Sequence, residues 1–179
     1  MSYRKGLQSL MMAVVLVGIG VLSAETQESA SNPAQQWEAL QKQVVARYKA
    51  GDYAGAEQLA RQALAVAERA FGPEHPDTAT SLNNLAVVLP AQSHQYGEVE
   101  PLLRRALTIR EKVLGAEHPD TATSLNNLAG MLRDQDRYGE AEPFLRRALA
   151  IDEKVLGAEH PDTVDSLSNL VARQRCSDG

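Results

Sequence analysis

Apolar residues recur at helical spacing in two stretches of the chain. The positions are Leu82, Leu85, Ala86 and Leu89 in the first stretch, and Leu125, Leu128, Ala129 and Leu132 in the second. Residues three and four apart lie on the same side of an α-helix. Each stretch therefore predicts a helix with one buried face.

These stretches belong to a longer internal repeat. Residues 114–121 return almost unchanged as residues 156–163, and residues 71–78 form an earlier copy. The histidine of each copy recurs after 43 and then 42 residues, at His75, His118 and His160. A fixed period of this length indicates stacked units of secondary structure.

The repeated motif predicts where one helix ends and the next begins. A glycine in the left-handed conformation would end each helix, at Gly72, Gly115 and Gly157. The proline and aspartate that follow suit the first turn of the next helix, where a missing N–H costs nothing and a carboxylate meets the positive helix end. These residues are Pro76, Asp77, Pro119, Asp120, Pro161 and Asp162.

A second helix is predicted in each unit, running in the last full repeat from about Gly139 to Leu156. Its expected apolar face consists of Ala141, Leu145, Ala148, Leu149 and Val155. Favourable i,i+4 pairs lie on its polar side and in the earlier copies, namely Glu57–Arg61, Glu100–Arg104 and Glu142–Arg146. No stretch alternates in the manner of a strand, so the predicted fold class is all-α.

The sequence resembles the tetratricopeptide repeat (TPR) in its 42-residue, kinesin-light-chain-like form. The resemblance rests on residues 121–129 (TATSLNNLA), 138–143 (YGEAEP) and 147–151 (RALAI), and it extends over residues 36–170. It implies an α-solenoid of antiparallel helix pairs stacked in a right-handed superhelix. It also implies that the first helices line a concave face that holds peptides.

The chain departs from the family pattern in three places. Val99 stands where the family usually has alanine, so we expect the local packing to adjust. Pro90 and one extra residue interrupt a first helix, which we expect to end near Leu89. The last unit has one helix, over residues 162–173. One interpretation is a terminal cap, and the alternative is a truncated member of a longer array.

The N-terminus predicts export. Arg4 and Lys5 precede an apolar run over residues 10–22, and small residues follow at Ser23 and Ala24. The run is shorter than the roughly 20 residues of a membrane-spanning helix. We interpret residues 1–24 as a signal peptide cleaved before Glu25, and the protein as secreted or periplasmic, with no membrane contact after cleavage. An uncleaved segment that anchors the protein in a membrane is the alternative.

The remaining chain is expected to divide into three parts. Residues 25–33 form a polar, flexible spacer. Residues 34–173 form the TPR array, with about three helix pairs and a terminal helix. Residues 174–179 form a disordered tail.

Composition narrows the range of functions for these 179 residues. The net charge of −5 argues against binding to nucleic-acid phosphates, and the 4% aromatic content argues against a base-stacking module. The sequence has one cysteine, Cys176, so an internal disulfide framework is excluded. No histidine lies near Cys176 in the sequence that could activate its thiol. No nucleic-acid partner is expected.

The histidines are the candidate metal ligands or general bases. His75, His118 and His160 occupy equivalent sites in successive repeats, so they should lie roughly 10 Å apart, the spacing of packed helices. Zinc needs ligands near 2.1 Å, so no two of them can share one ion. We predict no metal, no cofactor and no catalytic site, and interpret the histidines as helix-start residues.

Repeated asparagines are the candidate binding residues, because asparagine is a poor residue for a helix interior. One interpretation is structural, an inter-helix hydrogen bond. The other is an amide that binds the backbone of an extended peptide, including an acidic one. The candidate peptide-binding residues are Thr80, Asn83, Asn84, Thr123, Asn126, Asn127 and Arg133, with Val87 and Gly130 on the same stripes.

The function expected from these observations is an exported, non-enzymatic protein-interaction module that binds a peptide or protein on its concave face. The alternative is an assembly subunit that forms homo-oligomers through the solenoid ends. An enzyme is disfavoured because the repeat scatters its titratable groups instead of gathering them in one pocket.

Overall fold

The computed structural model describes residues 32–93 and 96–171. Within these ranges the chain forms helices α2 (Pro33–Lys49), α3 (Tyr53–Ala70), α4 (Pro76–Ser93), α5 (Tyr96–Val113), α6 (Pro119–Asp134), α7 (Tyr138–Val155) and α8 (Pro161–Val171). These residues contain no strand, so the all-α prediction is confirmed. The predicted signal peptide, nearly all of the predicted spacer and the predicted tail with Cys176 lie outside the described residues.

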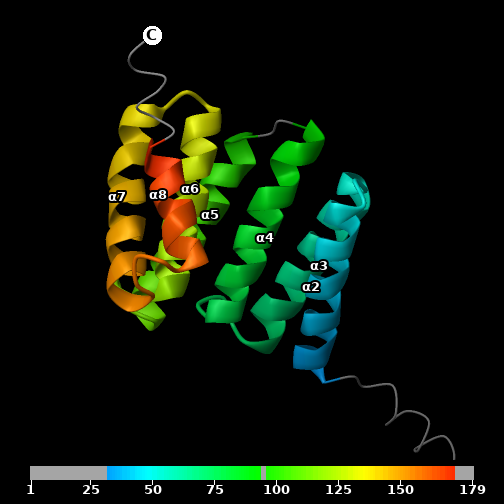
Figure 1. Ribbon diagram of the computed structural model, residues 1–179. Coiled ribbons are helices and arrows are strands. Elements are labelled where there is room, and N and C mark those ends of the chain that lie inside the picture. The colour runs from blue at the N-terminus through cyan, green and yellow to red at the C-terminus, as the bar shows by residue number, and fades with distance from the viewer. Residues whose placement is uncertain (1–31, 94–95, 172–179) are drawn as a thin grey trace, which may run out of the picture.

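The helices form a row in chain order. Figure 1 shows α2 and α3 at one end of the row and α7 and α8 at the other. Each helix packs against its neighbours in the chain, and the first helices of the repeats (α2, α4, α6 and α8) also contact one another in sequence. This arrangement is an α-solenoid, as the resemblance implied.

The boundaries predicted at the repeated glycines and prolines are confirmed. Gly72, Gly115 and Gly157 have φ values of 99°, 100° and 90°, the left-handed region in which glycine ends a helix without strain. Helices α4, α6 and α8 each begin at the repeated proline. The preceding histidine caps the helix, because its Nδ1 accepts the backbone N–H two residues later at 3.1–3.2 Å.

A buried threonine fastens the loop between repeats. The hydroxyl of Thr78 donates to the carbonyl of Gly72 at 2.7 Å, and Thr121 and Thr163 make the same bond to Gly115 and Gly157 at 2.8 Å. These threonines are 0–2% exposed. The glycine carbonyl also accepts the backbone N–H of the repeated histidine at 3.3–3.4 Å, so the threonine hydroxyl supplies its second and shorter hydrogen bond. The threonine bond explains why the glycine and the threonine recur together.

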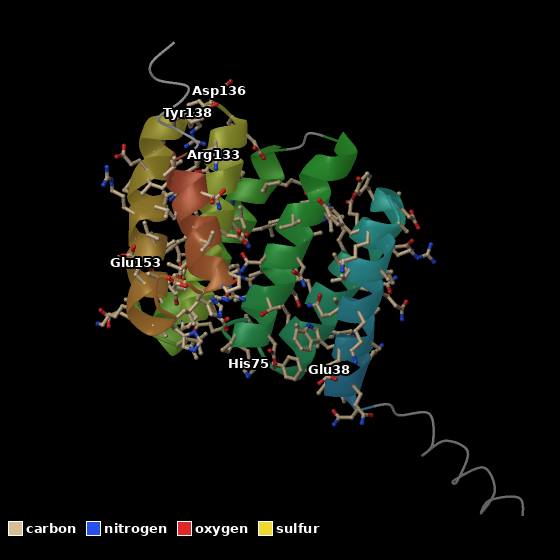
Figure 2. The ribbon with its side chains drawn as sticks, in the orientation of Figure 1. Glu38, His75, Arg133, Asp136, Tyr138 and Glu153 are labelled. Carbon is tan, nitrogen blue, oxygen red and sulfur yellow. The ribbon has the colours of Figure 1, made fainter. Side chains whose placement is uncertain are left out.

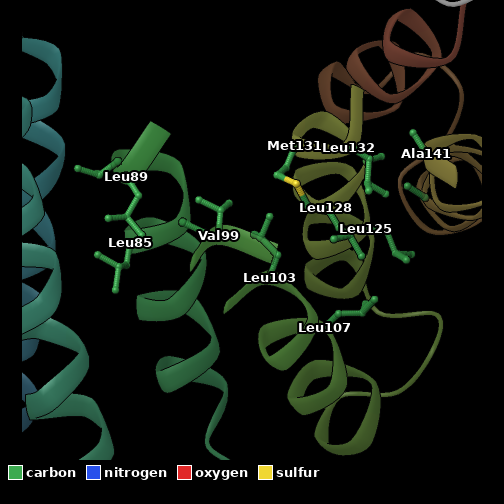
Figure 3. Close-up of a cluster of buried hydrophobic side chains, with 14 of the residues drawn as sticks. Leu85, Leu89, Val99, Leu103, Leu107, Leu125, Leu128, Met131, Leu132 and Ala141 are labelled. Carbon is green, nitrogen blue, oxygen red and sulfur yellow. The ribbon is translucent and has the colours of Figure 1, made fainter. Parts of the chain in front are cut away.

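The apolar faces pack as predicted, with one exception. Leu82, Leu85 and Leu89 of α4 and their equivalents in α6 are buried, and Figure 3 shows several of these side chains between the two repeats. Val155, which we assigned to the buried face of α7, is 47% exposed. It is the last residue of α7, and the equivalent Val113 at the end of α5 is exposed as well. Val99 is buried at the position where the family has alanine.

The prediction that Pro90 ends the helix near Leu89 is wrong. Helix α4 continues to Ser93, one turn further. A proline removes one backbone N–H and crowds the carbonyl four residues before it. Because Pro90 lies close to the end of α4, that cost falls on a single turn. Helices α5 and α7 also continue through a proline, at Pro101 and Pro143.

None of the helices in residues 32–93 and 96–171 combines the length and the apolar character that crossing a bilayer requires.

The threonine bond predicts a specific loss of stability. Thr121→Val keeps the shape of the side chain but leaves the Gly115 carbonyl with only the longer bond from the backbone N–H of His118, at 3.4 Å, and the loss of the hydroxyl bond should cost about 0.5–1.5 kcal/mol. Thr123→Val is the matched control, because Thr123 is exposed and donates to Pro119 in its own helix. Urea unfolding followed by circular dichroism measures both variants. Equal midpoints for the two variants would show that the loop bond does not stabilise the array.

Candidate functional site

A ladder of hydrogen bonds joins the first helices across the repeats. In α4, α6 and α8 a serine accepts a side-chain amide N–H from the preceding first helix. These serines are Ser81, Ser124 and Ser166. The donors are Gln41 to Ser81 at 3.0 Å, Asn83 to Ser124 at 3.0 Å and Asn126 to Ser166 at 2.7 Å. The indole of Trp37 also donates to Ser81, at 2.7 Å. We call these contacts the serine ladder.

The second helices approach the same ladder with opposite charges. Arg110 of α5 and Asp152 of α7 occupy equivalent positions in successive repeats, and both are buried. Arg110 donates to Ser124 at 3.0 Å, to the carbonyl of Asp120 at 2.7 Å and to Thr80 at 3.2 Å. Asp152 instead accepts from the hydroxyl of Ser166 at 2.6 Å. A serine hydroxyl serves both because it can donate and accept.

Burial shifts the pKa of each charged group in the direction that favours its neutral form. Burial raises the pKa of the Asp152 carboxyl, and the hydrogen bond from Ser166 offsets only part of that shift. Burial lowers the pKa of the Arg110 guanidinium, and the nearby carboxylate of Asp120 acts in the opposite direction. Among the described residues, neither group has an ion-pair partner of opposite charge within 4 Å. We interpret both as parts of the packing between repeats.

The structure places the predicted asparagines in two settings. Asn83, 4% exposed, and Asn126 belong to the serine ladder, so the inter-helix hydrogen bond that we weighed for them is present. Their Oδ1 atoms are buried and accept no hydrogen bond from the described residues. Asn84 donates to Gln41 at 2.7 Å, whereas Asn127 is half-buried and makes no side-chain hydrogen bond within the described residues.

The other three predicted residues make contacts within the array. Thr80 donates to Pro76 and accepts from Arg110, and Thr123 donates to Pro119. Arg133 donates to the side-chain oxygen of Asn169 at 3.1 Å and to its carbonyl at 3.3 Å. These contacts leave Thr123 exposed, join Thr80 to the second helix of its own repeat and use Arg133 to hold neighbouring repeats together.

A cavity of about 390 Å³ opens between α4 and α6. Val87 of α4 and Asn126, Asn127, Gly130 and Asp134 of α6 line it. Buried apolar side chains, among them Val99, Leu103 and Met131, form its wall. Tyr48 of α2 also lines the cavity. The volume lies in the lower part of the roughly 300–1,000 Å³ range of ligand pockets. The cavity can therefore accept one apolar group beside two amides.

Sequence reasoning found part of this lining. Asn126, Asn127, Val87 and Gly130 were on the predicted stripes. Sequence reasoning did not predict Tyr48, Met131 and Asp134 as lining residues. They come from different turns of α2 and α6 and do not occupy one repeated position, so the repeat gives no pattern that links them. Val99 was noticed as a departure from the family, and the structure places it in the cavity wall.

No cluster of three or more metal-ligating side chains occurs in residues 32–93 and 96–171. His75 lies at the loop between α3 and α4, where it stacks against Phe71 with ring centroids 5.1 Å apart (Figure 2).

Comparison with protein families agrees with the architecture. A family model described as "Tetratricopeptide repeat" matches residues 39–112, 88–154 and 120–177. The chain belongs to the tetratricopeptide repeat family. TPR arrays are protein-interaction scaffolds, a non-enzymatic family of folds.

Two solved structures are similar to this TPR protein. One, from Podosopora anserina, is described as a kinesin light chain with nearly identical TPR-like repeats; it is 27% identical over 78% of this chain and 65% of that one, with a TM-score of 0.71. BtubC (BKLC) from P. vanneervenii is 20% identical over 84% of this chain and 59% of that one, with a TM-score of 0.73, and shows the fold alone. The chain thus spans less than two thirds of either structure. No curated protein matches the chain.

The buried Asp152 predicts a pH-dependent effect on the TPR array. Asp152→Asn should stabilise the protein at neutral pH, since it removes the buried charge and keeps an oxygen that can accept from Ser166. Because the folded state binds this proton more tightly than the unfolded chain, the contribution of Asp152 to stability falls as pH rises from the unfolded pKa through the folded pKa.

The gain from Asp152→Asn should therefore be largest at neutral pH and vanish at about pH 3, where the carboxyl is protonated in both states. Thermal unfolding at the two pH values measures it, with the exposed Asp165→Asn as the control. A lower melting temperature for Asp152→Asn at neutral pH would contradict the prediction.

Proposed function

We propose that this TPR protein binds an extended peptide of a partner protein along its first helices, with one apolar side chain of the peptide in the cavity between α4 and α6. The observation that carries the proposal is the cavity itself, in which exposed Val87 and the amide of Asn127 stand beside a buried apolar wall. A peptide group can both donate to and accept from such an amide. An apolar side chain would cover Val87, which is 45% exposed.

The chemistry of the lining favours a neutral peptide at this point over an acidic one. Arg133, whose charge suggested an acidic ligand, is engaged with Asn169. Asp134 is the charged residue among those that line the cavity. An acidic side chain of the peptide would meet this carboxylate, whereas an apolar side chain or a backbone N–H would not be repelled.

Export forms part of the proposal. The basic residues, the apolar run and the small residues of the N-terminal segment support a secreted or periplasmic location after cleavage. The partner would then be an extracytoplasmic peptide or protein. Likeness to kinesin-light-chain-type repeats concerns the fold and carries no cytosolic partner with it.

Filling the cavity tests peptide binding. A Cβ atom on Gly130 would meet no atom within 4 Å, so the side chain of Gly130→Leu begins in open space at the cavity that Gly130 lines. The same change should stabilise α6 by roughly 0.5–1 kcal/mol, because leucine is the better helix former. Excluding a buried apolar group of the peptide should weaken binding about 10- to 150-fold.

The measurement is calorimetry with peptides selected from a display library on residues 25–179. Gly139→Leu is the matched control, since Gly139 is an exposed helical glycine away from the cavity. Asn127→Ala should weaken binding by a smaller factor, about 2- to 13-fold for one hydrogen bond. Unchanged affinity in Gly130→Leu would place the peptide elsewhere.

Export is tested on the native protein. N-terminal sequencing should find Glu25 as the first residue. An intact Met1 or Ser2 in the membrane fraction would instead show the anchored form, and peptide binding would then be expected at a membrane surface.

A further inference from the structure

Helix α8 presents an apolar stripe to the outside. Val164, Leu167 and Val171 are 47%, 46% and 42% exposed. The equivalent residues of α6 are Ala122, Leu125 and Ala129, and each is 0% exposed. The same stripe is thus buried in one first helix and open in the next.

The inner repeats show what covers this stripe. In α6 it packs in one cluster with Ala141, Leu145 and Ala148 of α7. In α4 the equivalent Ala79 and Leu82 pack against Ala106 and Ile109 of α5. In both repeats the cover is therefore a second helix with small and branched apolar residues on one face.

Ion pairs fix that second helix to the repeat before it. An arginine and a lysine seven residues apart on each second helix bind two glutamates of the preceding repeat. The pairs are Arg105–Glu68 at 2.7 Å and Lys112–Glu74 at 2.5 Å for α5, and Arg147–Glu111 at 2.5 Å and Lys154–Glu117 at 2.7 Å for α7.

The next pair of glutamates in this series is exposed beside α8. Glu153 and Glu159 are equivalent to Glu111 and Glu117, and they have no ion-pair partner among the described residues. Figure 2 shows Glu153 on α7, and Figure 1 shows α7 and α8 together at the end of the row. Lys154 is the lysine that lies between these two glutamates in the sequence. It cannot neutralise them, because it is paired with Glu117.

We propose that this end of the array docks an amphipathic helix of a partner protein. The helix carries an arginine and a lysine seven residues apart, which pair with Glu153 and Glu159. Its apolar face, made of small and branched residues, covers Val164, Leu167 and Val171. This surface is separate from the cavity between α4 and α6, so the proposal does not depend on peptide binding there.

Charge distinguishes this occupant from a second copy of the chain. Two copies packed through their α8 faces would bring the glutamates of each toward those of the other, and like charges at an interface oppose association. A basic helix supplies the opposite charge at both positions.

The probe for the experiment is an 18-residue peptide with the sequence of α5 (Tyr96–Val113), which carries Arg105 and Lys112 at the required spacing. Calorimetry of this peptide with the protein of residues 25–179 should show one-to-one binding. Leu167→Asp should weaken it about tenfold or more, since it places a charge in the apolar contact. Ser168→Asp is the matched control, because Ser168 is exposed next to the stripe on the same helix.

Charge exchange tests the ion pairs. The protein variant Glu153→Lys/Glu159→Lys should bind the peptide about tenfold more weakly. A peptide with Arg105→Glu and Lys112→Glu should recover the lost affinity with this variant and not with the unsubstituted protein. Gly130→Leu should leave all of these affinities unchanged, which separates this site from the peptide cavity.

Two results would overturn the proposal. One is the absence of peptide binding at concentrations up to about 1 mM, or binding that ignores both Leu167→Asp and the charge exchange. The other is a dimer in sedimentation experiments that Leu167→Asp dissociates while the peptide fails to bind, which would assign the face to a second copy.

Discussion

Each inner first helix of this chain must bury two apolar stripes, and that requirement organises the array. In α6 one stripe, with Ala122 and Leu125, packs against α7, while another, with Leu128 and Met131, faces the repeat before it. Alanines at the contacts allow helix axes to approach closely, and close packing supplies most of the stabilisation. Both apolar stripes of a first helix are therefore buried only when its second helix and a preceding repeat are present. For this reason the stability of such arrays depends on the contacts between neighbouring helices and repeats.

The same close approach takes polar groups out of water, and the repeat supplies partners for them at regular intervals. The threonine bond to the glycine carbonyl occurs in each of the three loops between repeats, and the serine ladder joins each successive pair of first helices. A buried polar group without a partner costs free energy, so these bonds also specify the register of the stack. Arg110 and Asp152 show that one position can carry either charge when the facing serine is able to donate or accept.

Two departures from regular packing leave surfaces open among the described residues. Gly130 and Val87 leave a space between α4 and α6 that larger or better-packed side chains would close. The outward stripe of α8 and its two glutamates repeat an interface that α5 and α7 complete in the inner repeats. Near-identical units thus differ mainly where a side chain is smaller than its equivalent, as at Gly130, or where a stripe has no covering helix among the described residues.

The sequence by itself determined the all-α fold, the helix boundaries at the repeated glycines and prolines, and most of the packing faces, because glycine, proline and apolar spacing act through local backbone geometry. It misplaced the end of α4, since the cost of Pro90 depends on how much helix follows it. It also left the role of Asn83 and Asn126 open. Only the tertiary structure placed their amides on Ser124 and Ser166, brought Tyr48 and Met131 to one cavity, and exposed Leu167 while burying Leu125. These outcomes depend on which helices become neighbours, and identical residues in successive repeats have different neighbours.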